Sequence, residues 1–214
     1  MKPKFLNRYT TLPILIDMLW RKQITLLSPN SWEDRNDAHY LERYQEEKEL
    51  GSVLALCFST KRETFHHWRV FSHGSGGVCI EFDAEEFLAG LRGKPEFRFG
   101  PVEYSRIDEI ERTPPKVERW PFLKRLPFAD EAEFRVICES PTVAELSRPL
   151  DFDIESVKRV TLGPWMPQPV AESVTALIET IEDCSGIYVH RSSLIENGRW
   201  KKAIKGPTRR RIRR

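Results

Sequence analysis

The chain has 214 residues and a mass of 25.1 kDa, with 40% hydrophobic residues and a formal net charge of +2. This length suits one domain with a core of its own, and the hydrophobic fraction excludes an intrinsically disordered chain. No apolar run approaches the roughly 20 residues that a membrane-spanning helix needs. The first residues, MKPKFLNRYTT, lack the apolar region of a signal peptide, so we expect a cytoplasmic protein with no membrane contact.

The elements of the first half of the chain alternate between short apolar runs and amphipathic segments. Runs of strand length rich in β-branched residues predict strands, and apolar residues at helical spacing predict helices. In chain order we expect strand 4–9, helix 11–23, strand 24–28, a polar turn region 28–39, helix 40–50, strand 52–59, helix 63–72 and strand 77–83.

The second half of the chain continues in the same manner after a helix at 84–93. Its charged and proline-rich part predicts a loop with a short helix over 106–129. After that we expect strand 131–138, a polar connection, strand 157–163, helix 169–184 and strand 186–191. Short strands with interspersed helices predict an α+β fold, a class in which a sheet is covered by flanking helices.

Positive charge is concentrated at the C-terminus. Residues 199–214, RWKKAIKGPTRRRIRR, hold nine of the 34 Lys and Arg residues and no acidic residue. Such a tail is typical of an arm that contacts phosphate groups, and a solvated terminus is the alternative. We therefore divide the chain into one α+β domain, residues 1–198, and a basic tail, residues 199–214, with possible nucleic-acid contact.

The hexapeptide DEAEFR, Asp130 to Arg135, precedes an apolar run and raises a question of charge. On a strand the side chains alternate between faces, so Glu131, Glu133 and Arg135 would share one face. Two carboxylates on one face repel each other, and burying either without a partner is costly. Either this face is solvated and Arg135 neutralises one Glu, or the pair belongs to an active site.

Two further candidate sites have little support. The cluster His66, His67 and His73 lacks a metal-ligand spacing such as H-E-x-x-H, so we expect no metal site. The glycines of GSGG precede a strand and lack the helix and the Lys-Ser/Thr pair that make a phosphate loop. We expect a turn there.

Several short motifs in a fixed order resemble the bacterial domain of unknown function 2971 family, over most of residues 5–165. The most specific of them are the GVCIEFD strand, preceded at spacing by Trp68, and the E-x-E-F-R strand. The full set is NRYTTL, LLSPNSWEDRND, CFST, WRVFSHGSGGVCIEFD, VEYS, DEAEFRVI and VKRVTLG.

That family in turn resembles the ADP-ribosyltransferase superfamily, whose members are built on a split mixed sheet. One large class of them places an Arg in the first strand, Ser-Thr-Ser at a strand end and Glu-x-Glu on a later strand. The matching residues here are Arg8, Ser59 with Thr60, and Glu131 with Glu133, while Lys61 stands in place of the third Ser. The resemblance therefore implies an ADP-ribosyltransferase-like fold, a split mixed sheet with flanking helices.

The resemblance also implies roles at an NAD site that needs no metal. Breaking the bond between nicotinamide and ribose passes through an oxocarbenium-like state, which a carboxylate can stabilise. By this resemblance Glu133 would hold the ribose and stabilise the cation, and Glu131 would position or deprotonate the acceptor. Arg8 would bind the diphosphate and Ser59, with Thr60 beside it, would orient Glu133.

The remaining site residues have two interpretations each. Trp68, with Tyr9 or Phe71, could form aromatic walls for nicotinamide, or these rings could be part of the core. Arg135 could be an ion-pair partner that fixes the two Glu residues or a contact to the bound ligand.

The resemblance makes an NAD-consuming transferase our leading expectation. It implies an ADP-ribosyltransferase that acts as a toxin or phage-defence effector on a protein or nucleic-acid acceptor. An NAD glycohydrolase, with water as the acceptor, would need the same site. The alternative is a non-catalytic module of the same fold that binds nucleic acid or another partner through its arginine-rich tail.

Overall fold

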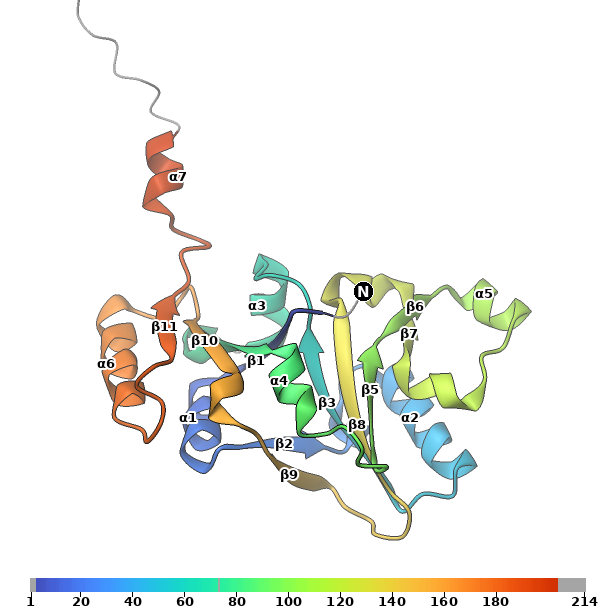
Figure 1. Cartoon of the computed structure of the whole chain (residues 1–214). Helices are drawn as coiled ribbons and strands as arrows, with labels where there is room; N and C mark the ends of the chain where they lie inside the picture. The colour runs from blue at the N-terminus through green and yellow to red at the C-terminus, as the bar shows by residue number, and fades with distance from the viewer. Residues whose placement is uncertain (1–2, 73, 204–214) are drawn as a thin grey trace, which may run out of the picture.

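The computed structural model describes residues 3–72 and 74–203 (Figure 1). The part of the basic tail beyond residue 203 and His73 lie outside the described residues. Within the described part, the strands are β1 Phe5–Thr11, β2 Gln23–Leu27, β3 Ser52–Ser59, β4 Gly77–Asp83, β5 Phe97–Pro101, β6 Glu103–Ser105, β7 Leu123–Arg125, β8 Glu133–Ser140, β9 Ser147–Asp151, β10 Val157–Leu162 and β11 Tyr188–Arg191.

Helices cover both ends of the sheet. In Figure 1, α2 and α5 gather with β6 and β7 beside β5 and β8, and α6 packs at the other end of the molecule, next to β11. The α-helices are α1 Leu12–Arg21, α2 Arg35–Glu47, α3 Phe65–Phe71, α4 Ala84–Ala89, α5 Ile107–Arg112, α6 Gln168–Glu179 and α7 Gly198–Ala203. Short 3₁₀ helices lie at Pro29–Ser31, Gly74–Gly76, Val117–Phe122, Leu126–Glu131 and Ile154–Ser156.

The large sheet is mixed and consists of two halves. Strands β11, β10, β4 and β1 form one half, in which β10 and β11 are parallel and the other pairs antiparallel. Strands β3, β8 and β5 form the other, extended by β2 and β9. The halves meet where β1 pairs with β3, and that pairing has one register position, Asn7 opposite Ser59. The expected α+β fold with a split mixed sheet and flanking helices is therefore confirmed.

The alternation of β8 supplies two different buried faces. Phe134, Val136 and Cys138 join the main core, which continues through β3 and β4 to α4 and α6. The opposite face carries Glu133, Arg135 and Ile137, and Ile137 belongs to a second core built against α2. Because α2 and its neighbours cover this face, the charged residues of β8 are not on a solvated surface.

Several local features differ from the sequence-based expectations. Strand β8 begins at Glu133 and not at Glu131, because Glu131 ends a 3₁₀ helix and Ala132 turns the chain with φ 44° and ψ 53°. Helix α2 begins inside the expected polar turn, at Arg35, because the Asp34 carboxylate caps it. The expected polar connection contains β9, which pairs with β2 although its sequence, SRPLD, is mostly polar.

Two other expectations concern turns and membranes. The GSGG stretch forms a 3₁₀ turn between α3 and β4, as predicted. No helix of the described ranges is both long and apolar enough to cross a membrane.

Candidate active site

Strands β1, β3 and β8 align three of their residues in one row across the split. Asn7 lies opposite Ser59, and Ser59 lies opposite Glu133. The Ser59 hydroxyl donates a hydrogen bond to the backbone carbonyl of Glu131, 2.7 Å away, and the Thr60 hydroxyl donates to the carbonyl of Ala132 at 3.0 Å. The strand-end hydroxyls therefore fix the backbone that carries the Glu pair. These contacts hold the backbone that leads into Glu133, and an orienting role of Ser59 toward Glu133 stays a prediction.

Arg8 lies in the wedge where β1 and β3 separate. Its Nη1 donates to the backbone carbonyl of Cys57 at 2.9 Å, beyond the single position at which the two strands pair. The side chain is half-buried, and burial lowers the pKa of Arg8, while the charge of Glu133 acts in the opposite direction. Arg8 thus contributes positive charge close to Glu133 from the other half of the sheet.

Arg135 is fully buried and uses all five of its N–H groups. Its Nε and Nη2 donate to the two carboxylate oxygens of Glu133 at 2.7 and 3.0 Å. Nη1 and Nη2 donate to the two oxygens of Asp37 at 2.9 and 2.7 Å, and Nη1 also donates to the carbonyl of Pro121 at 2.8 Å. Of the two interpretations of Arg135, the ion-pair partner is the one that this geometry supports, since no N–H group is left for a ligand.

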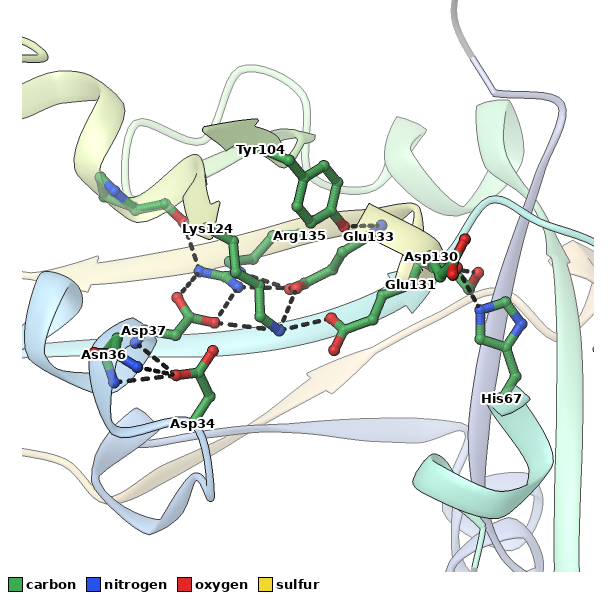
Figure 2. Close-up of polar contacts among 12 residues, drawn as sticks. Asp34, Asn36, Asp37, His67, Tyr104, Lys124, Asp130, Glu131, Glu133 and Arg135 are labelled. Atoms are coloured by element: carbon green, nitrogen blue, oxygen red, sulfur yellow. Dashed lines mark hydrogen bonds and ion pairs between the residues drawn. The ribbon is translucent and has the colours of Figure 1, made fainter. Parts of the chain in front are cut away.

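Lys124 joins the two Glu residues to Asp37 (Figure 2). Its Nζ lies 2.6 Å from Glu131, 3.4 Å from Glu133 and 3.6 Å from Asp37. The Lys124 side chain is only 9% exposed, and its ammonium lies against the carboxylates of both Glu residues. Asp37, Lys124, Glu131, Glu133 and Arg135 together form what we call the ion cluster.

The ion cluster holds three carboxyl groups and two cations, and the carboxyls differ in acidity. Burial would raise the pKa of Glu133, but Arg135 and Lys124 outweigh it and lower this pKa to about 2. For Glu131, burial is the larger effect and raises the pKa against the opposing charge of Lys124. Burial likewise raises the pKa of Asp37, against Arg135. Glu133 is therefore the permanent anion, and Glu131 is better suited to accept and release a proton.

The three aromatic residues considered as ligand walls form a small separate cluster. Trp68 is fully buried, its indole N–H donates to Glu63 at 2.9 Å, and its ring meets that of Tyr9 edge-on at 5.2 Å. Tyr9 is 6% exposed, and Phe71 packs against the same cluster. Trp68 therefore corresponds to the core interpretation, because no part of its surface is open to a ligand.

Three residues that the sequence did not single out hold this site together, with His67, which was considered there only as a metal ligand. Asp37 and Lys124 belong to the ion cluster, and the Tyr104 hydroxyl accepts a hydrogen bond from the backbone N–H of Glu133 at 2.8 Å. The Nε2–H of the buried His67 donates to the carbonyl of Asp130 at 3.1 Å. The signal in the sequence was indirect, since two neighbouring Glu residues need cationic partners only if both are buried.

The carboxyl groups of the ion cluster are directed at cationic side chains. No group of three or more His, Cys, Asp or Glu side chains in residues 3–72 and 74–203 is arranged to hold a metal ion. The three carboxyls of the ion cluster are instead turned toward Arg135 and Lys124.

Comparisons with known proteins give distant structural likenesses. No protein-family model and no curated protein matches the chain. DarT of Thermus sp. 2.9 in complex with NAD+ is 10% identical, with a TM-score of 0.46 over 90% of this chain and 96% of that chain. DarT of Thermus sp. 2.9 in complex with ADP-ribosylated ssDNA is also 10% identical, with a TM-score of 0.45 over 89% of this chain and 94% of that chain.

Removing the guanidinium of Arg135 should be strongly destabilising. Arg135→Met leaves Glu133 and Asp37 buried without their main partner, which costs about 3–5 kcal/mol of unfolding free energy. Arg135→Lys keeps the positive charge but not the planar set of donors, and should lower the free energy of unfolding by less. Urea unfolding measures both, with Arg21→Met as control, because the exposed Arg21–Asp17 pair contributes no more than about 1 kcal/mol. Equal effects of Arg135→Met and Arg21→Met would contradict this account of the cluster.

Acid should remove the contribution of Glu133 to stability. Its folded pKa of about 2 lies below the ordinary 4.5, so its contribution is complete above pH 4.5 and is lost as the pH falls toward 2. The loss amounts to about 3 kcal/mol. Unfolding free energies measured between pH 5 and 2 should therefore fall more steeply for the wild type than for Glu133→Gln. Parallel curves would show that Glu133 is not the depressed carboxyl.

Proposed function

We propose that the chain is an NAD-consuming transferase that transfers ADP-ribose to a nucleophile on a protein or nucleic acid. The observation that carries the proposal is the row in which β1, β3 and β8 meet. Asn7, Ser59 and Glu133 are direct register partners there, and Arg8 lies next to the row in the wedge between the half-sheets. First-strand Arg, strand-end Ser and Glu-x-Glu are therefore neighbours in space, although the intervening segments are long.

The proposed step breaks the bond between the ribose C1′ and the nicotinamide nitrogen of NAD. Nicotinamide leaves with the bonding electron pair, and the positive charge that develops on the ribose is stabilised by the permanently ionised Glu133. The acceptor nucleophile then bonds to C1′ and gives its proton to Glu131, whose raised pKa suits a base. Arg8 supplies positive charge for the diphosphate of NAD.

Lys124 must move for this chemistry to occur. Its ammonium lies between Glu131 and Glu133 in the structure, and both carboxylates are almost completely buried. A lysine side chain has four rotatable bonds and can swing outward, so substrate binding and displacement of Lys124 are coupled in this proposal. Without Lys124 the pair carries one more uncompensated negative charge, which favours a cationic transition state next to it.

Nicotinamide release tests the proposal. Wild-type protein incubated with NAD, with and without cell extract as a source of acceptors, should release nicotinamide. Glu133→Gln removes the stabilising charge and should slow release by at least about 100-fold, the scale of one lost electrostatic contact in a transition state.

A control variant and a second active-site variant separate the roles of Glu133 and Glu131. Glu179→Gln alters an exposed carboxylate on α6 and should leave the rate unchanged. Glu131→Gln should slow transfer to a protein or nucleic-acid acceptor more than it slows hydrolysis, in which water is the acceptor. If neither wild type nor variants consume NAD even with extract present, the enzymatic proposal is wrong.

A second candidate function, non-catalytic binding of nucleic acid, is favoured by the composition of α7. In this short helix, Trp200 is 72% exposed and lies between the basic residues Arg199, Lys201 and Lys202. An exposed indole can stack on a base while the cations contact phosphates. Figure 1 shows α7 projecting away from the sheet, where a partner can reach it.

Deleting residues 206–214 tests this second candidate. The deletion removes five arginines, so single-stranded nucleic acid should bind more weakly and with a flatter salt dependence. Each lost phosphate contact should reduce the slope of log K against log salt by about 0.7. Fluorescence anisotropy at several salt concentrations measures the slope, with Arg92→Gln, an exposed cation elsewhere, as control. An unchanged slope would exclude a contribution from the tail.

A further inference from the structure

Three consecutive backbone carbonyls around Glu131 each accept a hydrogen bond from a side chain. The carbonyls of Glu131 and Ala132 accept from the two hydroxyls at the end of β3. The carbonyl before them, that of Asp130, accepts from the Nε2–H of His67 at 3.1 Å (Figure 2). Because His67 lies on α3, two separate elements of the fold hold the segment that carries Glu131.

This segment has a backbone conformation that needs such support. Ala132 has φ 44° and ψ 53°, in the left-handed region that an alanine rarely adopts. A conformation of this kind persists only where surrounding contacts determine it. The His67 contact is made on the N-terminal side of Glu131, so it fixes the direction in which the chain enters the turn at Ala132.

The His67 ring contributes a hydrogen-bond donor in surroundings that would suit an apolar ring. It is fully buried, with its centroid 5.5 Å from that of Tyr9 and 5.9 Å from that of Phe71. A carbonyl oxygen only accepts, so the proton is on Nε2, and the buried Nδ1 has no hydrogen-bond partner among the described residues. Burial lowers the pKa of His67, which keeps the ring neutral at neutral pH. A phenylalanine would fill the same space without an unpaired nitrogen, so packing alone does not account for the imidazole.

Glu133 is held in place by contacts that do not involve His67. Its backbone N–H donates to the Tyr104 hydroxyl at 2.8 Å, and its carbonyl accepts from the backbone N–H of Val102 at 2.9 Å. Its carboxylate is fixed by Arg135. Loss of the His67 contact would therefore loosen the backbone before Glu133 and leave Glu133 where it is.

We propose that His67 is a positioning residue that places Glu131 to take the proton of the acceptor, and that it thereby sets how ADP-ribose is divided between the acceptor and water. The inference rests on the proposed function for the reaction itself. The buried ring does not touch the substrate and acts only through the carbonyl of Asp130. When this contact is lost, nicotinamide still leaves with its electron pair, because Glu133 is unmoved. Bonding of the acceptor to C1′, with transfer of its proton to Glu131, becomes slower.

Two substitutions of His67 separate its donor from its ring. His67→Phe keeps a ring against Tyr9 and Phe71 but has no donor. His67→Gln carries a terminal NH2 group at nearly the reach of Nε2 and can donate to the same carbonyl. The ratio of transferred to hydrolysed ADP-ribose should fall about fivefold in His67→Phe, the scale of one neutral hydrogen bond, and stay near the wild-type value in His67→Gln. Labelled NAD incubated with cell extract measures both products, after subtraction of the extract alone.

This ratio does not depend on how much of the protein is folded, so a purely structural role of His67 would not change it. His39→Phe, which alters an exposed imidazole on α2, is the matched control and should keep the wild-type ratio. A wild-type ratio in His67→Phe would overturn the inference. An equal fall in His67→Phe and His67→Gln would also overturn it, because the donor would then not matter.

Hydrogen–deuterium exchange tests the same contact without any turnover. The backbone N–H groups of residues 130–132 should exchange faster in His67→Phe than in wild type, and at the wild-type rate in His67→Gln. Wild-type exchange in His67→Phe would overturn the inference whatever the protein does with NAD. Faster exchange in His67→Phe, in a protein that never consumes NAD, would keep His67 as the anchor of this segment and reject the proposed reaction.

Discussion

The guanidinium of Arg135 is the interaction on which the rest of the site depends. It is fully buried on β8 and satisfies Glu133, Asp37 and the carbonyl of Pro121 with all five N–H groups. Glu133 lies on β8 itself, Asp37 on α2 and Pro121 in a 3₁₀ helix, so one side chain ties two other segments to one face of the sheet. A buried cation with any of its donors unpaired would be costly, so the positions of α2 and the 3₁₀ helix are constrained together.

The split between the half-sheets is the second constraint, and it follows from a single strand pairing. Because β1 and β3 share one register position, backbone groups beyond it must find other partners, and the side chain of Arg8 supplies one for Cys57. The same divergence leaves Ser59 and Thr60 at a strand end, where their hydroxyls bind the carbonyls that precede β8. The split thus brings a cation and two hydroxyls to the residues that carry the Glu pair.

Much of this arrangement could be predicted from sequence where local patterns decide it. The α+β class, the alternation of β8 and the pairing of Arg135 with a Glu follow from side-chain periodicity and charge. Asp37 and Lys124 could not be predicted, because they come from α2 and β7, and only tertiary packing brings them to β8. The start of β8 was misplaced because the positive φ of Ala132 has no signature in a residue that is neither Gly nor Asn. Trp68 was open to two interpretations because ligand walls and cores use the same aromatic residues.

The three carboxyls of the ion cluster fall into two groups by their acidity. A cluster that served only to hold β8 against α2 would be no more stable than a well-packed apolar contact, since the cost of burying ions offsets their attraction. Arg135, Lys124 and Arg8, which adds positive charge close to Glu133, face the three carboxyls. Burial raises the pKa of Glu131 and Asp37, whereas Glu133 stays ionised beside Arg135. One carboxyl can exchange a proton, and its neighbour stays ionised. Acid–base catalysis requires the first kind of group and electrostatic catalysis the second.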